Sequence, residues 1–109
     1  METKLYDLTS LEAAVDGDQA FMNKMIQLIL TETPEELKAM ESALGLSDYQ
    51  RVSSIAHKLK SSIHFVCISS LFSSIREVEE WKQPDEIMIK KTQLLIANIS
   101  ALLDQIENI

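Results

Sequence analysis

Apolar side chains recur at steps of three and four residues along most of this chain, and that spacing limits the fold more than any other feature. The C-terminal segment shows it most clearly, with inward positions at Met88, Thr92, Leu95, Ile99, Leu102 and Ile106. The pattern places side chains on one face of an α-helix and is typical of helices in a bundle. No segment alternates for long with the period of two that indicates a strand. Only two Gly and two Pro interrupt the chain, so we expect a few long helices joined by short links.

A capping box formed by Thr9 and Glu12 predicts a short helix near the N-terminus. Gly17 follows at a position where helices often end in a left-handed turn, and so we expect it to end this helix. The short helix is expected to lie over one end of the fold as a lid, in addition to the longer helices.

The segment from Asp18 to Gly45 allows two interpretations. Asp18 can cap its start, and Gly45 closes it. Inside it, Thr33 precedes Pro34, a pair that often marks the start of a helix. A proline inside a continuous helix produces a kink instead. The sequence therefore predicts either one long kinked helix or two consecutive ones.

Three more helices complete the chain. Ser47 is expected to cap the first of these, with Gln50 as its capping-box partner, and Pro84 separates the last two. The boundary between residues 64 and 70 carries no Gly or Pro. Four principal helices with short links indicate an all-α fold, an antiparallel four-helix bundle with a short extra N-terminal helix, in a single domain over residues 1–109.

Composition argues against several classes of function. The formal net charge is -7, which disfavours nucleic acid or an anionic membrane surface as a partner. The single cysteine, Cys67, cannot form an internal disulfide and suits a reducing compartment. No apolar run approaches the ~20 residues that span a bilayer, and charged residues interrupt the N-terminus where a signal peptide would lie. We therefore expect a cytoplasmic monomer without membrane insertion.

The stretch AHKLKSSIHF, residues 56–65, contains both histidines of the chain. The apolar positions of this helix are Val52, Ile55, Leu59 and Ile63. At about 100° per residue, His57 lies about 145° from the centre of that stripe, so its side chain is expected to face solvent. The polar residues within about 60° of it are Ser53, Lys60, Ser61 and His64.

The same helix differs from the rest of the chain in charge. No Asp or Glu occurs between Tyr49 and Arg76, although the protein has 17 acidic residues. The basic residues of that segment are Arg51, Lys58, Lys60 and Arg76. We therefore predict a basic face around His57. We see no paired carboxylate–histidine arrangement and no nucleotide-binding loop, which argues against an enzyme with its own substrate pocket.

An exposed imidazole beside a lysine suits chemistry on phosphorus. A free imidazole has a pKa of about 6.5 and is largely neutral near pH 7, and a neutral ring nitrogen is a competent nucleophile. Lys60 can supply positive charge to a phosphoryl group. Ser61 is small and leaves room for that group, and Ser53 or Ser61 could hydrogen-bond the phosphate or the ring.

The segment AHKLKSS resembles the motif of the histidine-containing phosphotransfer (HPt) domain family, usually written H-x-L-K-G-S. The matching residues are His57, Leu59, Lys60 and Ser62. The similarity also includes TPEELKAMESAL upstream and VEEW downstream, and it extends from about Tyr6 to Trp81. The final helix is similar to the family only in its pattern.

This resemblance implies a four-helix bundle in which His57 carries a phosphoryl group and Lys60 helps to balance its charge. Members accept the group from an aspartate of a receiver domain and pass it to another receiver, without ATP and without autokinase activity. The implied partners are receiver domains of response regulators and hybrid histidine kinases, and the Mg²⁺ belongs to the partner. No cofactor or metal of its own is implied. The expected partner contacts are Ser61, Lys58, His64, Ser53, Met22 and Met25.

Two departures from the family pattern concern small residues. Ser61 replaces the family's glycine after the lysine, which we expect to alter partner preference rather than abolish function. Cys67 stands where the family often has a second glycine that ends the helix, so we expect this helix to run further than usual.

Three other interpretations are open from the residues alone. The chain could dock a receiver or a kinase without carrying phosphate, or it could be a plain structural helical domain, which would leave the missing acids unexplained. A metal site from His57, His64 and Cys67 is disfavoured, because these three residues spread over three helical turns, whereas structural zinc takes four close ligands.

Overall fold

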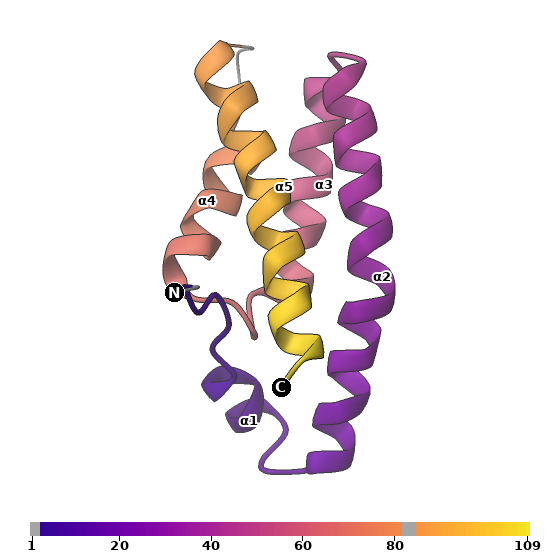
Figure 1. The fold of residues 1–109 in the computed structure, drawn as a ribbon, viewed down its shortest axis with the longest axis vertical. Helices are drawn as coiled ribbons and strands as arrows, with labels where there is room; N and C mark the ends of the chain where they lie inside the picture. The colour runs from indigo at the N-terminus through magenta and orange to yellow at the C-terminus, as the bar shows by residue number, and fades with distance from the viewer. Residues whose placement is uncertain (1–2, 82–84) are drawn as a thin grey trace.

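The structure is a computed structural model of the 109-residue chain, and it describes residues 3–81 and 85–109. The described residues form five helices, shown in Figure 1: α1 (Thr9–Ala14), α2 (Gln19–Gly45), α3 (Tyr49–Ile63), α4 (Ser69–Glu79) and α5 (Glu86–Glu107). The one extended pairing among them is an isolated bridge between Tyr6 and Cys67. The all-α prediction is therefore confirmed.

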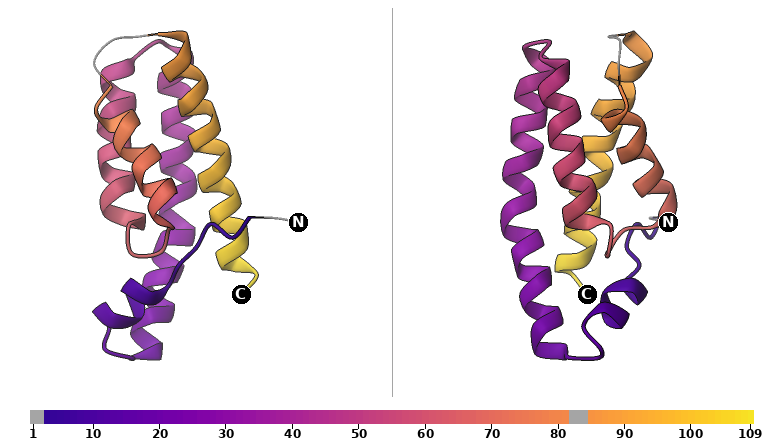
Figure 2. Two further views of the ribbon diagram at one scale, coloured as in Figure 1. Left: turned by 90° about the vertical axis from the view of Figure 1, so that its left-hand side faces the viewer. Right: turned by 180° about the vertical axis from the view of Figure 1, so that it is seen from behind.

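The four longer helices form an antiparallel bundle. Consecutive helices from α2 to α5 pack side by side, and α5 also packs against α2, which closes the ring. α2 is the longest of them and extends past the end of α3, where α1 lies below the bundle (Figure 2). The architecture thus agrees with a four-helix bundle that has a short extra N-terminal helix.

The core consists of the apolar stripes that the sequence predicts. The inward positions of α3, which are Val52, Ile55, Ala56, Leu59 and Ile63, are all buried. The stripe of α5 is buried at Thr92, Leu95, Ile99, Leu102 and Ile106. Helical periodicity therefore gives the correct inward face of both helices.

The segment with two interpretations is one helix. α2 continues through Pro34, so Thr33 does not begin a new helix. Because proline has no backbone N–H, the carbonyl four residues earlier loses its usual donor inside the helix. Asp18 caps the start of α2, as predicted, and its Oδ1 accepts a hydrogen bond from the Phe21 backbone N–H at 3.1 Å.

Two other predicted caps are wrong by one residue. α3 is capped by Asp48, whose Oδ1 accepts from the Arg51 N–H at 3.2 Å. Ser47 lies one residue earlier in a left-handed turn, with φ of 57°. At α1 the N-cap is Leu8, without a side-chain bond. A carboxylate next to the helix start replaces the predicted serine cap at α3, since both groups accept from the same orphan N–H groups.

α3 ends at Ile63 and does not run on through Cys67 as expected. The segment after it pairs with the chain near the N-terminus, where Asp7 N–H donates to the Val66 carbonyl at 2.8 Å and Ile68 N–H donates to the Leu5 carbonyl at 3.0 Å. This pairing provides backbone bonds outside the helix, so the turn needs no glycine. The predicted break at Pro84 lies outside the described residues.

Within residues 3–81 and 85–109, no helix combines the length and the apolar character needed to cross a membrane.

Candidate functional site

His57 projects from the middle of α3, as the sequence predicts. Its side chain is 64% exposed, whereas Ala56 before it and Leu59 after it are completely buried. The change from buried to exposed within one turn follows from the helical rotation of about 100° per residue. The imidazole is therefore held in solvent by a helix whose opposite face is fixed in the core.

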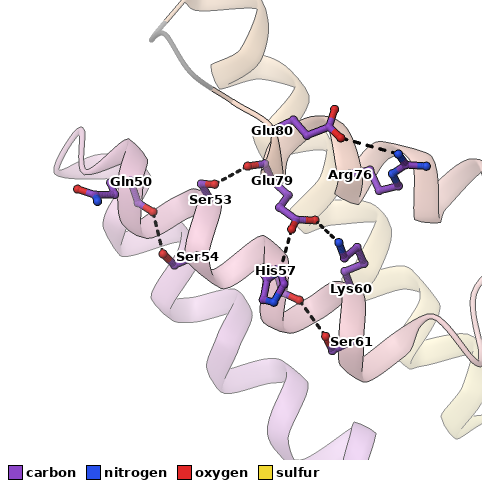
Figure 3. Close-up of polar contacts among 9 residues, drawn as sticks. All are labelled: Gln50, Ser53, Ser54, His57, Lys60, Ser61, Arg76, Glu79 and Glu80. Atoms are coloured by element: carbon purple, nitrogen blue, oxygen red, sulfur yellow. Dashed lines mark hydrogen bonds and ion pairs between the residues drawn. The ribbon is translucent and has the colours of Figure 1, made fainter.

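A carboxylate from another helix meets this imidazole. Glu79, the last residue of α4, places Oε1 2.7 Å from Nδ1 of His57 and Oε2 2.7 Å from Nζ of Lys60 (Figure 3). One carboxylate thus contacts both of the residues that the motif brings together. The expectation that no carboxylate–histidine pair exists is wrong, because the two partners are 22 residues apart in sequence and meet only when α3 packs against α4.

The position of Glu79 is fixed by its backbone as well as its side chain. The Ser53 hydroxyl, one turn before His57 on α3, donates to the Glu79 carbonyl oxygen. That carbonyl is at a helix C-terminus, where the last oxygens lack partners within their own helix. Just beyond α4, the rings of Tyr49 and Trp81 lie 4.7 Å apart between centroids. These contacts hold the end of α4 against the side of α3.

The electrostatics of this group favour one form of the histidine. Hydrogen bonds from Lys60 and then from His57 lower the pKa of the Glu79 carboxyl below its ordinary value. The carboxylate is therefore ionised near neutral pH and can only accept hydrogen bonds. A contact at 2.7 Å then places the proton of the neutral ring on Nδ1. This tautomer leaves the lone pair on Nε2, the nitrogen away from Glu79.

The serines near His57 bond to backbone carbonyls rather than to the ring. Ser61 donates to the His57 carbonyl at 3.3 Å, and Ser62 donates to the Lys58 carbonyl at 2.9 Å. The Ser53 hydroxyl donates to the Glu79 carbonyl oxygen instead. The expected hydrogen bond from Ser53 or Ser61 to the ring is thus not formed. Ser61 is exposed one turn after His57.

Two of the four basic residues in the predicted basic segment are paired with acids of α4. Lys60 pairs with Glu79, and Arg76 lies 3.8 Å from the carboxylate of Glu80. Lys58 faces α2, where it partly offsets the raised pKa that burial gives to Glu36. The segment without acids in the sequence therefore has acidic neighbours in space, from α2 and α4.

The other predicted partner contacts lie at different distances from His57. His64 is exposed directly after the last residue of α3, seven residues beyond His57, and its Nδ1 is 3.2 Å from the Ser61 carbonyl. Met22 is buried and Met25 is half-buried near the start of α2. α2 and α3 are antiparallel, so Met25 lies roughly 18 Å beyond His57 along the bundle, at 1.5 Å per residue. The structure does not bring the two methionines to the histidine.

In the part of the chain that the structure describes, no group of three or more His, Cys, Asp or Glu side chains could hold a metal ion. His57, His64 and Cys67 do not converge, and Cys67 is buried in the turn after α3. Burial raises the pKa of the Cys67 thiol to about 11, so it stays protonated at neutral pH.

Comparison with protein families gives one match. A family model described as "Hpt domain" matches residues 24–109, which include most of α2 and all of α3, α4 and α5. Searches of curated proteins and of solved structures gave no match. The family match begins later than the resemblance near Tyr6 and continues past Trp81 to include the final helix. Because the match covers most of the chain, the chain belongs to the Hpt domain family.

Proposed function

We propose that this chain is a phosphorelay intermediate, which accepts a phosphoryl group on His57 from a receiver-domain aspartate and passes it to another receiver domain. Hpt domains are phosphocarrier modules of two-component and phosphorelay signalling that interact with receiver domains. The single observation that carries the proposal for this chain is the geometry of His57, with an exposed side chain and Nδ1 held by Glu79.

This geometry suits attack on phosphorus. Phosphoryl transfer needs in-line access to the phosphorus atom and neutralisation of charge on its oxygens. Because the ring is exposed on the outer face of α3, a macromolecular partner can bring its phosphoryl group to Nε2. Lys60 is close enough to share Glu79 with the imidazole, so its ammonium can turn towards a phosphoryl group on the same ring.

The remaining expectations form part of the same proposal. The donor and the acceptor supply the acidic pocket and the Mg²⁺, and the chain has no autokinase activity. Lys58, Ser61 and His64 are exposed around or beyond His57, and we propose that they contact the receiver. A monomeric state and a cytoplasmic location stay predictions.

A second candidate is an Hpt-like module that docks a receiver or kinase without carrying phosphate. Two observations favour it: Ser61 occupies the family's glycine position, and Lys60 is already paired with a carboxylate. Such a module would bind receivers equally well with or without His57.

The test is loading of the purified chain with phosphoramidate, a small phosphoryl donor, and with ³²P-labelled receiver domains. Wild type should gain an acid-labile phosphoryl group, and His57→Gln should gain none. For loading with phosphoramidate, His64→Gln is the matched control, because it removes the chain's other histidine, which is also exposed. Equal label on wild type and His57→Gln would contradict the assignment, and receiver binding without any label would favour the second candidate.

A further inference from the structure

A groove runs between α2 and α5, and its lining repeats one pattern on both helices. The lining residues that share this pattern are Leu30, Pro34, Leu37 and Glu41 of α2, and Ile96, Ser100, Leu103 and Glu107 of α5. Each set follows steps of four, three and four residues along the sequence, so it forms one stripe on its helix. The groove has a volume of about 360 Å³.

The floor of the groove is apolar, and the fold does not cover it completely. Leu37 and Leu103 are buried, whereas Leu30, Pro34 and Ile96 are only half-buried. Leu30 and Ile96 also pack against the core, so a rigid surface supports the part that meets water. Burial of this apolar surface against a partner is favourable.

The two ends of the groove carry acidic residues. Because α2 and α5 are antiparallel, Glu41 lies at one end, and Glu107 lies at the other with Asp104 one turn inside it. Within residues 3–81 and 85–109, none of these three carboxylates forms an ion pair. Lys38, which also lines the groove, pairs with Glu35 at 3.7 Å. The groove therefore joins an apolar floor to unpaired negative charge at both ends.

Pro34 adds a backbone acceptor to the same surface. Because proline has no N–H, the Leu30 carbonyl loses its usual donor inside α2, and both residues line the groove. Carbonyls and ionised carboxylates only accept hydrogen bonds, whereas Lys and Arg side chains only donate them. An occupant with Lys or Arg beside its apolar residues therefore complements this groove in both hydrogen bonding and charge.

The groove lies across the bundle from the histidine. The helix contacts form a ring in the order α2, α3, α4, α5, so the α2–α5 seam is opposite the α3–α4 seam, where His57 meets Glu79. α5 lies in front of α3 in Figure 1, and α3 lies in front of α5 in the view from behind in Figure 2. A partner bound in the groove therefore leaves the imidazole free.

We propose that the groove between α2 and α5 docks an amphipathic helix of a partner protein, one with an apolar stripe and with Lys or Arg at both ends of that stripe. Recognition of a helix in a groove uses apolar anchors at i, i+3 or i+4 and i+7. The stripe from Leu30 to Glu41 is roughly 17 Å long at 1.5 Å per residue, so the docked helix has about three turns. A second copy of this chain is disfavoured, because it carries the same net charge of -7. The proposal goes beyond phosphoryl transfer and does not depend on it.

The test uses a synthetic peptide of about 16 residues, long enough to form a helix, with Leu on one face and Lys at both ends. The control peptide has the same composition in an order that spreads Leu around the helix. Fluorescence anisotropy of the labelled peptides measures binding to the whole chain. The amphipathic peptide should bind at least about tenfold more tightly than the control. Its NMR shift changes should fall on residues 30–41 and 96–107, and not on His57.

A pair of tryptophan variants locates the docking site. Ser100→Trp fills the groove, whereas Ala97→Trp adds the same side chain to another exposed position of α5 that does not line it. Ser100→Trp should weaken binding of the amphipathic peptide by at least about tenfold, and Ala97→Trp by less than about twofold, because only the first occupies the space of the apolar anchors. Circular dichroism of each variant verifies that the helices are retained.

A pair of charge variants tests the ends of the groove. Glu41→Gln combined with Glu107→Gln removes one acid from each end, whereas Glu12→Gln combined with Glu86→Gln removes two exposed acids outside the groove. At low salt the first double variant should weaken binding by about fivefold and the second by less than about twofold. The difference should shrink as salt is added, because exposed charges are screened.

Equal binding of the two peptides, or equal effects within either pair of variants, would overturn the proposal. So would a wild-type dimer in analytical ultracentrifugation that Ser100→Trp dissociates, since the groove would then hold a second copy. Phosphoramidate loading of His57 should stay within about twofold when the peptide is bound, as for distant independent sites, and a larger inhibition would contradict the separation of the two sites. Failure of His57 to load at all would contradict the proposed function and leave the docking groove in place.

Discussion

The two faces of α3 differ in how they are specified. The inward face packs apolar side chains, and each of its positions follows from the spacing within this one helix. The outward face carries His57 and Lys60, whose common partner Glu79 comes from the end of α4. Local periodicity therefore decides which side chains enter the core, whereas the chemistry of the site depends on how two helices pack. Substitutions on the two faces should separate stability from phosphoryl transfer.

The largest expected effect is on stability and comes from the inward face. Leu59 lies between His57 and Lys60 in sequence and is completely buried. Leu59→Ala should lower the free energy of unfolding by about 2–5 kcal/mol, through lost burial and a cavity. Urea denaturation measures the loss, and Leu59→Met, which conserves volume, should cost less than about 1.5 kcal/mol. If the two faces are separate in function, the folded fraction of Leu59→Ala should still load phosphate at the wild-type rate.

The next effect belongs to the outward face and is on transfer. Lys60→Ala should slow phosphoramidate loading by about tenfold, or ~1.4 kcal/mol of transition-state stabilisation, because a positioned ammonium near the transferring group is lost. Lys58→Ala is the matched control, since Lys58 is the exposed neighbour that is directed towards α2. Stability of both variants should stay within about 1 kcal/mol of wild type. Equal loading rates for the two lysine variants would remove Lys60 from the mechanism.

The sequence predicts much of this molecule but leaves out the partner of its histidine. Exposure of His57, burial of Leu59 and the bundle itself follow from helical spacing, which is a property of neighbouring residues. Glu79 could not be found that way, because nothing within α3 indicates which residue of α4 will lie beside the ring. One signal was available: VEEW, part of the family resemblance, contains Glu79 and Glu80. It does not tell which of the two turns towards α3.

The end of α3 shows a second limit of sequence reasoning. With Cys67 in place of a glycine, a longer helix was the natural prediction. The chain near Tyr6 instead pairs with the segment after Ile63, and these residues are about 60 positions apart in sequence. The predicted N-cap of α3 is wrong by one residue for a related reason. Ser47 and Asp48 are both residue types that favour the N-cap, and the backbone conformation, with Ser47 in a left-handed turn, decides between them.

A third prediction concerns the hydrogen bond that joins α3 to the end of α4. Ser53→Ala removes the hydroxyl that donates to the Glu79 carbonyl and should lower the free energy of unfolding by about 1 kcal/mol, the usual net value of such a bond. Ser54→Ala removes a hydroxyl that donates to the Gln50 carbonyl within α3 at 3.1 Å, and it should change the free energy of unfolding by less than about 0.5 kcal/mol. Thermal or urea unfolding compares them. Equal losses would mean that Ser53 does not fix α4.

The smallest effect is a pH dependence that differs between two glutamates facing α3. The pKa of Glu79 is lowered in the folded protein by Lys60 and His57, so its carboxylate stabilises the fold above the ordinary glutamate pKa. That contribution disappears as pH falls through the lowered value. Glu36 has a raised pKa because of burial, and its Oε2 has no hydrogen-bond partner among the described residues. It therefore penalises the fold when ionised, and the penalty is relieved as pH falls towards the ordinary value.

At pH 7, the free energy of unfolding of Glu79→Gln should thus be lower than that of wild type by less than about 1 kcal/mol, as for other partly exposed ion pairs. At acidic pH the two proteins should differ little. Glu36→Gln should show the opposite trend: it should be more stable than wild type at pH 7 and equally stable at acidic pH. Urea unfolding of wild type and the two variants between acidic pH and pH 7 measures how each variant's difference in unfolding free energy from wild type changes with pH. These changes are the two slopes to compare. If the two slopes had the same sign, the difference between Glu79, paired beside the histidine, and Glu36, which faces α3 from α2, would not hold, and the assignment of Glu79 as the ionised partner of His57 would fail with it.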